Sequence, residues 1–363
     1  MMDKMEIMSP VGSWESLRAA AQGGADAVYF GVGRLNMRSR SAANFGVEDL
    51  PRLVAEAAGA GMKSYLTANT VVYDPELDEV QRLLEAAREA GVSAVIASDM
   101  AVIERARRLG LEVHLSTQCN VSNREAVRHY AQWADVMVLA RELPLEQVAA
   151  ITRCIADEHL CGPGGGPVRV EMFAHGALCM SVSGKCYLSL DNAGFSANRG
   201  ACLQLCRRGY IVKDKESDLE LEIDNEYIMS PKDLCTIGFL DRMAAAGVRV
   251  LKIEGRGRSA DYVRTTTECY REAVEALAQG CYTEERIAEW TRRLATVFNR
   301  GFWDGYYLGR RLGEWSDRYG SQATERKVYL GPVRNYFGRI GVAEVELQTA
   351  ESLRVGDELM AIG

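Results

Sequence analysis

The chain has 363 residues, which at roughly 150 residues per domain is enough for one large domain and a smaller appendage. Its 47% hydrophobic and 26% charged residues are typical of a globular protein and exclude global disorder. A net charge of −7 argues against a protein that coats nucleic acid through bulk positive charge. Because no segment has the roughly 18 to 20 consecutive apolar residues of a membrane span, and the first residues lack the order of a signal peptide, we expect a cytoplasmic protein.

Short apolar and β-branched runs alternate with helical patterns along most of the chain, which predicts βα units around a parallel sheet. The eight predicted strands are Lys4–Ser9, Asp26–Gly31, Lys63–Ala68, Ala94–Ser98, Glu112–Ser116, Val136–Ala140, Val168–Phe173 and Val248–Glu254. The helical segments between and after them include Ser13–Gly23, Val47–Gly59, Pro75–Ala90, Asn123–Trp133, Leu145–Ile155, Asp261–Gln279 and Thr283–Phe298. Since eight parallel strands close a barrel, we predict an α/β fold, a TIM-like (β/α)8 barrel over residues 1–315, with a doubly wound open sheet as the alternative.

Two segments depart from the barrel pattern. Residues 174–247 are far longer than an ordinary βα connection, which indicates an insertion before the last strand. Its end, Ser230–Leu234, has the pattern of a helix start. Residues 326–363 alternate like strands, and we predict a partial small β-barrel module there. Its expected strands are Lys327–Leu330, Arg339–Leu347 and Glu358–Ile362.

Four of the ten cysteines fall within 28 positions of the insertion. They are Cys179, Cys186, Cys202 and Cys206. Four thiolates complete the coordination of either a [4Fe-4S] cluster or a structural zinc. Zinc usually takes closely spaced pairs, and only Cys202 and Cys206 form one, so the spacing favours iron–sulfur modestly and leaves zinc open. Cys235 is an alternative fourth ligand to Cys206.

The residues that follow the predicted strands form an unusually polar set. In a closed barrel the carboxyl ends of the strands form the active face, so we expect these side chains to share a pocket, although each one alone is equally well explained as a helix cap. Arginines also gather on this face, which favours a substrate with phosphate or carboxylate groups. The residues expected to hold anionic groups are Arg38, Arg141 and Arg256. The residues expected to orient the substrate or move protons are His175, Asn69, Gln118, Glu254 and Lys252.

Several segments together resemble the collagenase-like peptidase family U32, in the order typical of that family, from the N-terminus to about residue 280. These segments are Pro10-Val-Gly-Ser-Trp-Glu-Ser-Leu17, Gly24-Ala-Asp-Ala-Val-Tyr-Phe-Gly31, His175-Gly-Ala-Leu-Cys179, Ser183-Gly-Lys-Cys186, Ala197-Asn-Arg-Gly200 with Cys202 and Cys206, Ser230-Pro-Lys-Asp-Leu234 and Lys252-Ile-Glu-Gly-Arg256. The C-terminal tail also resembles the β-barrel module of longer family members, here cut short.

The resemblance implies an iron–sulfur protein that supports oxygen-independent hydroxylation. Better-understood relatives act on a tRNA wobble uridine with prephenate, on a ribosomal RNA cytidine, or on ubiquinone precursors. By this resemblance the four clustered cysteines would hold a [4Fe-4S] cluster, which places iron–sulfur well above zinc. The C-terminal β tail favours the RNA-modifying members, so the implied partners are tRNA or ribosomal RNA, or a small carboxylate co-substrate such as prephenate.

The family name also implies proteolysis, which is the alternative function. The sequence contains neither His-Glu-x-x-His nor Gly-x-Ser-x-Gly, and of its four histidines only His175 follows a predicted strand. His175 and Cys179 are the sole candidate pair for a peptidase, and a nucleophilic Cys179 would conflict with a cluster ligand. A third hypothesis is a non-enzymatic scaffold that delivers substrate or iron–sulfur cargo to a partner protein.

Overall fold

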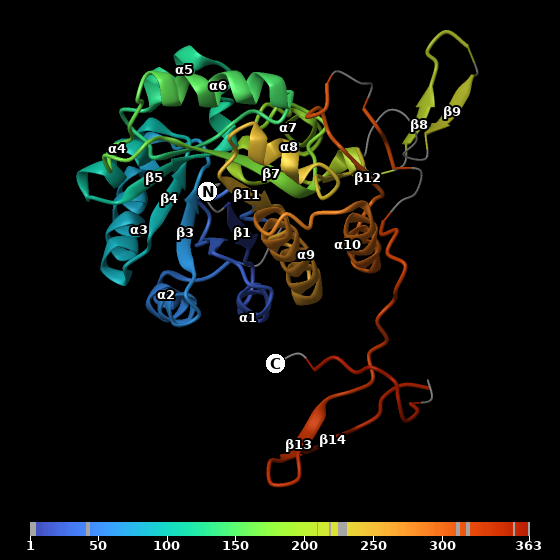
Figure 1. The fold of residues 1–363 in the computed structure, drawn as a ribbon. Helices are drawn as coiled ribbons and strands as arrows, with labels where there is room; N and C mark the ends of the chain where they lie inside the picture. Colours follow the sequence, from blue (N-terminus) through green and yellow to red (C-terminus); the bar gives the residue numbers. More distant parts are fainter. Residues whose placement is uncertain are drawn as a thin grey trace.

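The computed structural model describes residues 5–40, 44–208, 210–217, 219–223, 231–309, 313–316, 320–350 and 353–361. Eight parallel strands follow one another around a closed barrel (Figure 1), because β11 pairs with both β1 and β7. The strands are β1 (Glu6–Pro10), β2 (Ala27–Gly31), β3 (Lys63–Ala68), β4 (Ala94–Ala97), β5 (Glu112–Leu115), β6 (Val136–Val138), β7 (Arg169–Ala177) and β11 (Val250–Ile253). The predicted TIM-like barrel is therefore confirmed, and the open sheet is wrong.

Helices from between the strands and after the last barrel strand surround the barrel (Figure 1). They are α1 (Trp14–Gln22), α2 (Leu50–Gly59), α3 (Leu77–Ala90), α4 (Met100–Arg108), α5 (Arg124–Tyr130), α6 (Leu145–Asp157), α8 (Leu240–Ala245), α9 (Ala260–Ala278) and α10 (Glu284–Thr296). Local signals fix their ends: the Ser13 side chain accepts a hydrogen bond from the Ser16 amide at the start of α1, and Gly91 takes a left-handed conformation after α3. No helix in the described ranges is long and apolar enough to cross a membrane.

The barrel strands bury both faces, because successive side chains point alternately into the barrel and toward the helices. The outward face packs with the helices in a large apolar core that includes Val28, Phe30 and Leu66. A smaller apolar cluster that includes Met8, Tyr29 and Tyr65 fills the barrel interior. The interior is therefore a packed core, and the space for a ligand lies above it, at the carboxyl ends of the strands.

The insertion begins where β7 runs past the barrel to Ala177. It contains α7 (Leu188–Ala193), the short turns η4 (Ala197–Arg199) and η5 (Leu205–Arg207), and a hairpin of β8 (Tyr210–Lys213) and β9 (Glu220–Ile223). The predicted helix start at Ser230–Leu234 is wrong: Asp233–Cys235 forms β10, which pairs antiparallel with the free end of β7. An extended β7 supplies unpaired backbone groups, and β10 satisfies them. The following helix, α8, begins only at Leu240.

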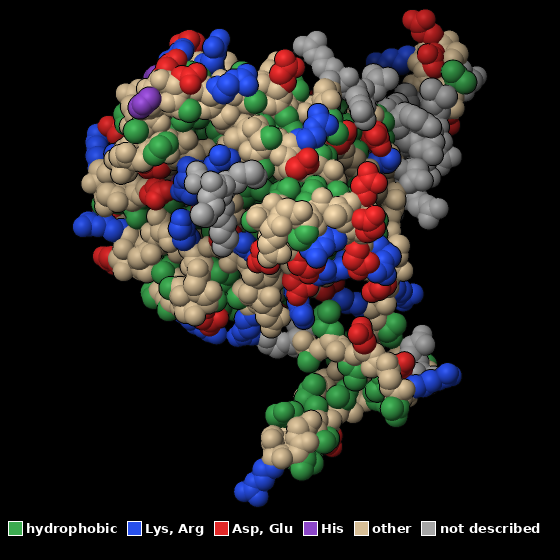
Figure 2. Space-filling view, viewed as in Figure 1, with side chains coloured by type: hydrophobic (Ala, Val, Ile, Leu, Met, Phe, Trp, Pro, Cys, Tyr) green, Lys and Arg blue, Asp and Glu red, His purple; other side chains and the backbone are tan. Residues whose placement is uncertain are grey.

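The C-terminal segment lies apart from the barrel and carries one hairpin (Figure 1). Its strands, β13 (Val333–Phe337) and β14 (Val342–Val345), differ from the prediction of strands at 327–330, 339–347 and 358–362, because residues 338–341 form the hairpin turn. A further short strand, β12 (Phe302–Trp303), pairs with β10. Figure 2 shows apolar side chains exposed over the C-terminal segment. The β-barrel module remains a prediction, and Lys4, Ser230 and Ile362, at the ends of predicted elements, lie outside the described residues.

Candidate active site

A cavity of about 440 Å³ opens at the carboxyl ends of the barrel strands. Its lower wall comes from barrel side chains such as Tyr29, Thr67 and Phe173, and its upper wall comes from the insertion, residues 177–188 and 197–207. This volume lies within the roughly 300 to 1,000 Å³ typical of small-molecule sites. The parallel strands bring these residues together because all of them end at the same rim.

The structure brings together all but one of the residues predicted for the site. The residues that line the cavity are Arg38, Asn69, Gln118, Arg141, Lys252, Glu254, Arg256, Cys179, Cys186, Cys202 and Cys206. Both polar atoms of Asn69 already have a partner, since its side-chain oxygen accepts from the Met37 amide and its nitrogen donates to the Ser116 hydroxyl. The Oε1 atom of Gln118, in contrast, is buried without a hydrogen-bond partner among the described residues, which leaves it available to a ligand.

His175 is the exception, because it does not line the cavity. Phe173 pairs with Lys252, but the register between β7 and β11 then shifts, so that His175 pairs with Ile253. The extra residue turns the His175 side chain from the barrel interior to the helix side. There its ring packs against Tyr262, Tyr270 and Phe302, with ring centroids 6.0, 5.7 and 5.5 Å away. Burial, helped by the charge of Arg258, lowers the pKa of His175 to about 3, so the imidazole is neutral at physiological pH.

A buried ion pair forms the floor of the cavity. Lys252 Nζ donates to Glu171 Oε1 at 2.8 Å, and both side chains are almost completely excluded from solvent. The ammonium group also lies 4.7 Å from the centroid of the Tyr29 ring, within the range of a cation–π interaction. Glu171 therefore holds Lys252 in place, with its charge at the base of the cavity.

Glu254 is the acidic side chain that lines the cavity. Its carboxylate accepts from Arg38 Nη2 at 2.6 Å and from the Tyr29 hydroxyl at 3.3 Å. Burial alone would raise the pKa of Glu254, but the charges of Arg38, Arg141 and Arg256 outweigh burial and lower it to about 2. Glu254 is therefore an anion at neutral pH. It holds the Arg38 guanidinium in place and does not carry a proton that it could donate.

This lowered pKa predicts an acid-dependent change in stability. An ionised Glu254 stabilises the fold above its ordinary pKa of about 4.5, and this contribution is lost as the pH falls toward 2. We expect Glu254→Gln to lower the free energy of unfolding by up to about 3 kcal/mol at pH 7, and expect the difference from wild type to shrink at pH 3. Urea unfolding across this pH range measures it, and a difference independent of pH would contradict the assignment.

Arg256 and Arg141 are held differently. Arg256 donates to the Thr67 hydroxyl at 2.9 Å, and its guanidinium passes so close to Gly31 that a Cβ there would lie 2.5 Å from it. Burial lowers the pKa of Arg256 to about 10, which still leaves it charged at neutral pH. Arg141 lies over the Phe173 ring, 3.9 Å from its centroid, and its Nε atom has no partner among the described residues. Arg141 therefore retains a donor for a bound anion.

Positive charge dominates the cavity. One acidic side chain, Glu254, and eight basic ones occur among the described residues that line it. The basic residues are Arg38, Arg141, Lys185, Arg207, Lys252, Arg256, Arg258 and Arg300. Carboxylates outside the lining neutralise two of these, since Glu171 pairs with Lys252 and Asp233 pairs with Arg300. The remaining excess favours an anionic ligand in a chain whose net charge is −7.

The four predicted cysteine ligands all line this cavity as free thiols. Within the part of the chain that the structure describes, no three His, Cys, Asp or Glu side chains converge closely enough to surround a metal ion, so the four thiols share the cavity without forming a compact coordination sphere. Arg207 links the two ends of the insertion, donating to the Leu178 carbonyl at 2.6 Å and to the Pro231 carbonyl at 2.8 Å. Four thiols are the donors that a thiolate-ligated metal group takes. Cys235, the alternative fourth ligand, does not line the cavity.

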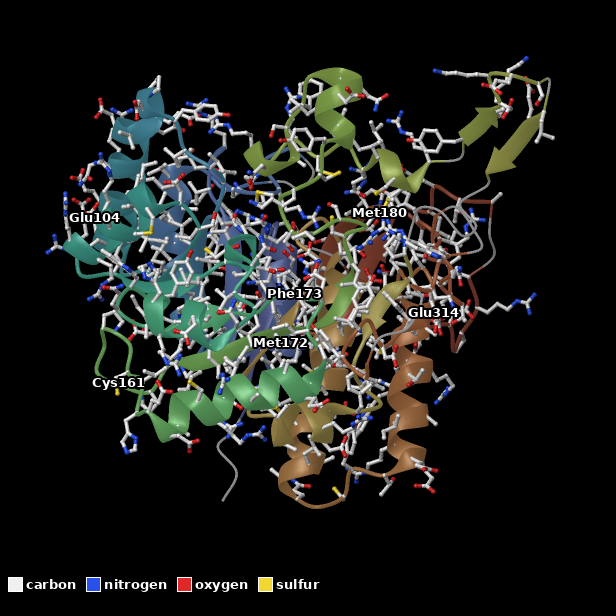
Figure 3. All side chains as sticks on the ribbon, turned by 90° about the horizontal axis from the view of Figure 1, so that it is seen from above. Glu104, Cys161, Met172, Phe173, Met180 and Glu314 are labelled. Atoms are coloured by element: carbon white, nitrogen blue, oxygen red, sulfur yellow. The ribbon has the colours of Figure 1, made fainter. Side chains whose placement is uncertain are left out.

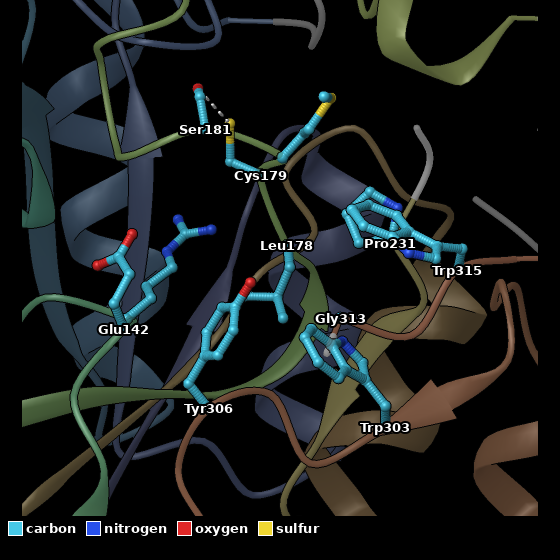
Figure 4. A pocket seen from close by; sticks show the side chains of 11 residues that line it. Glu142, Leu178, Cys179, Ser181, Pro231, Trp303, Tyr306, Gly313 and Trp315 are labelled. Carbon is cyan, nitrogen blue, oxygen red and sulfur yellow. Dashed lines mark hydrogen bonds between the residues drawn. The ribbon is translucent and has the colours of Figure 1, made fainter. Parts of the chain in front are cut away.

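A narrow cleft adjoins the cavity beside Cys179 (Figure 4). Trp303, Tyr306 and Trp315 line the cleft, and Arg141 and Cys179 also line the main cavity. Cys179 Sγ lies 3.4 Å from the Ser181 hydroxyl. Cys179 therefore lies between a cleft lined by aromatic side chains and the cationic cavity.

A model of peptidase family U32 matches residues 12–317 of the chain. A protein of Porphyromonas gingivalis named collagenase is 59% identical over 99% of this chain and 86% of its own length. A tRNA hydroxylation protein of Bacillus subtilis is 32% identical over 99% of this chain and 84% of its own length. A 23S rRNA 5-hydroxycytidine synthase of Escherichia coli is 34% identical over 98% of this chain and 52% of its own length. The chain belongs to peptidase family U32.

Proposed function

We propose that this chain is an enzyme that hydroxylates a base of tRNA or ribosomal RNA in the cytoplasm. The observation that carries the proposal is the excess of basic side chains in a cavity that four thiols also line. RNA supplies the phosphates that such a cavity favours. Relatives at 32% and 34% identity, named for tRNA hydroxylation and for 5-hydroxycytidine synthesis in 23S rRNA, support the same reaction class.

Under this proposal the arginines bind the anionic groups of the substrates. Arg141 has a donor without a partner among the described residues, and Arg38 and Arg256 are held by Glu254 and Thr67. Bidentate guanidinium contacts suit phosphate and carboxylate equally well. A nucleotide phosphate, or a small carboxylate co-substrate such as prephenate, would therefore lie against these three side chains.

We also propose that Cys179, Cys186, Cys202 and Cys206 hold a [4Fe-4S] cluster, with zinc as the alternative. When bound, such a cluster supplies either electron transfer or a Lewis-acidic iron. The chain's own residues have separate tasks at the floor of the cavity. Lys252 Nζ, held by Glu171, places a proton next to an oxyanion bound above it, and Gln118 Oε1 accepts a hydrogen bond from a base edge or hydroxyl.

Mass spectrometry of nucleosides tests the proposed reaction. Total tRNA and ribosomal RNA from a strain that lacks this gene should lose one hydroxylated pyrimidine nucleoside that the parent strain contains. An unchanged nucleoside profile would contradict RNA hydroxylation.

Peptide hydrolysis is the second candidate function. The 59% identical relative named collagenase favours it. A cysteine peptidase needs a base within hydrogen-bond reach of its nucleophile, and none of the four histidines of the chain, all within the described ranges, lines the cavity with Cys179. Cleavage of collagen-like peptides by the pure protein, blocked by thiol reagents, would support this function.

One substitution separates the two functions. His175→Phe keeps an aromatic ring among Tyr262, Tyr270 and Phe302, so we expect a change of less than about 1.5 kcal/mol in the free energy of unfolding. RNA hydroxylation should persist in this variant, because His175 does not reach the cavity. If His175→Phe lost all RNA hydroxylation while its stability stayed unchanged, the result would contradict this expectation. It would favour a reaction in which the His175 imidazole takes part, as in the peptidase hypothesis.

A further inference from the structure

The mouth of the cavity has an exposed apolar rim on the insertion. Tyr187 is 74% exposed and Met180 is 47% exposed, yet both also line the cavity. Val182 and Leu190, from the same segment, are 46% and 40% exposed. Exposed apolar side chains beside a binding cavity are a mark of a contact surface rather than of packing. We call Met180 and Tyr187, the two of these residues that line the cavity, the rim.

The rim and the arginines lie on different walls of the same cavity. The cations Arg38, Arg141 and Arg256 come from segments that follow the barrel strands, whereas the rim belongs to the insertion between β7 and β10. Figure 3 looks down on the barrel and labels Phe173 on β7 and Met180 on the insertion. A ligand in the mouth therefore meets positive charge on one side and an aromatic or apolar face on the other. A nucleotide strand has this combination of anionic phosphates and flat bases.

We infer that Tyr187 is a stacking platform for the unpaired base next to the nucleotide that enters the cavity. This inference rests on the proposed function and names the form of its substrate: a short single-stranded stretch of RNA. The flanking base stacks on Tyr187 while the adjoining phosphate lies against the arginines. Among the described residues no ring or cation packs on Tyr187, so its face is open to a base.

The size of the cavity favours a single base that is no longer paired. A volume of about 440 Å³ suits one nucleotide-sized body. An enzyme that acts on a base must take it out of a helical stack, which costs least where the base is already unpaired. The platform then supplies the stacking partner that the flanking base would otherwise lack.

The charge distribution limits how much RNA is held. The chain as a whole is negatively charged, and the positive excess is concentrated in the cavity. Contact with about two phosphates predicts a plot of log affinity against log salt concentration with a slope of only about −1.4. A protein that bound RNA along an extended path would have a much steeper slope.

Fluorescence anisotropy with a labelled single-stranded RNA hexanucleotide of mixed sequence tests the inference on the full chain purified without oxygen. We expect Tyr187→Ala to weaken binding about 10-fold, as for loss of one base–aromatic stack. Tyr187→Phe, which retains the ring, should bind like wild type. Tyr336→Ala is the matched control, because Tyr336 is 64% exposed on the distant β13 strand and should not affect binding.

The outcomes separate this inference from the proposed function. Wild-type binding that Tyr187→Ala leaves unchanged would overturn the stacking platform and leave RNA hydroxylation standing. Equal losses in Tyr187→Ala and Tyr187→Phe would show that the hydroxyl, not the ring, makes the contact, which also overturns it. Equal affinity for the same sequence as a duplex would contradict the unpaired substrate. Failure of wild type to bind any RNA would overturn both proposals.

Discussion

Cys202→Ser should remove the iron from the protein. Wild-type protein purified without oxygen should carry about four irons and an equivalent amount of sulfide per chain, because four thiolates line one cavity. Loss of one of the four ligands leaves an incomplete coordination set, and we expect the iron content to fall by most of its value and RNA hydroxylation to be abolished. Iron, sulfide and zinc analysis of both proteins makes the measurement.

Cys161→Ser is the matched control for this prediction. Cys161 is an exposed free thiol in the loop before β7, and in Figure 3 it lies well apart from Met180. Its substitution should leave the iron content unchanged. One zinc per wild-type chain, or full iron retention in Cys202→Ser, would contradict the [4Fe-4S] assignment.

Breaking the buried pair of Glu171 and Lys252 should produce the largest loss of stability. Both side chains are almost fully buried, so removing one partner leaves an uncompensated charge in the barrel. We expect Glu171→Leu and Lys252→Met each to lower the free energy of unfolding by about 3 to 5 kcal/mol. The double variant, with two apolar side chains, should recover much of that loss. Denaturant unfolding of the four proteins measures the coupling.

A surface pair supplies the comparison. Glu104 and Arg108 form an i,i+4 ion pair on α4 with both side chains largely exposed (Figure 3 labels Glu104). Glu104→Gln should therefore change the free energy of unfolding by less than about 1 kcal/mol. If Lys252→Met were no more destabilising than Glu104→Gln, the Glu171–Lys252 pair would not contribute to the stability of the fold as predicted.

The sequence predicts the barrel well because its strands are short apolar and β-branched runs that alternate with helical patterns. All eight predicted strands overlap observed ones. It fails where tertiary pairing decides the structure. The segment Ser230–Leu234 has the local pattern of a helix start, yet Asp233–Cys235 forms a strand because the extended end of β7 offers it a partner. Local residue propensities do not predict this pairing, because it depends on a strand that is distant in the sequence.

In the candidate site, too, local patterns predict some residues, and tertiary pairing decides the position of others. Arg38, Arg141 and Arg256 could be predicted because side chains after parallel strands converge on one rim. His175 satisfies the same rule, and the register shift between β7 and β11 moves it away. Sequence reasoning also missed Glu171, Tyr29 and Thr67, although they alternate with outward residues on their strands. Every second residue of a strand points into the barrel, so following this alternation back from the carboxyl end of each strand would have identified these three residues.

If this cavity serves the hydroxylation of an RNA base, a substitution within it should reduce the hydroxylated nucleoside in cellular RNA. A strain lacking the gene is complemented with wild type, Arg141→Gln or Cys161→Ser, and the hydroxylated nucleosides in its RNA are measured by mass spectrometry. We predict that wild type and Cys161→Ser restore the missing nucleoside, whereas Arg141→Gln restores it poorly. Equal restoration by Arg141→Gln, or no missing nucleoside in the first place, would contradict the claim.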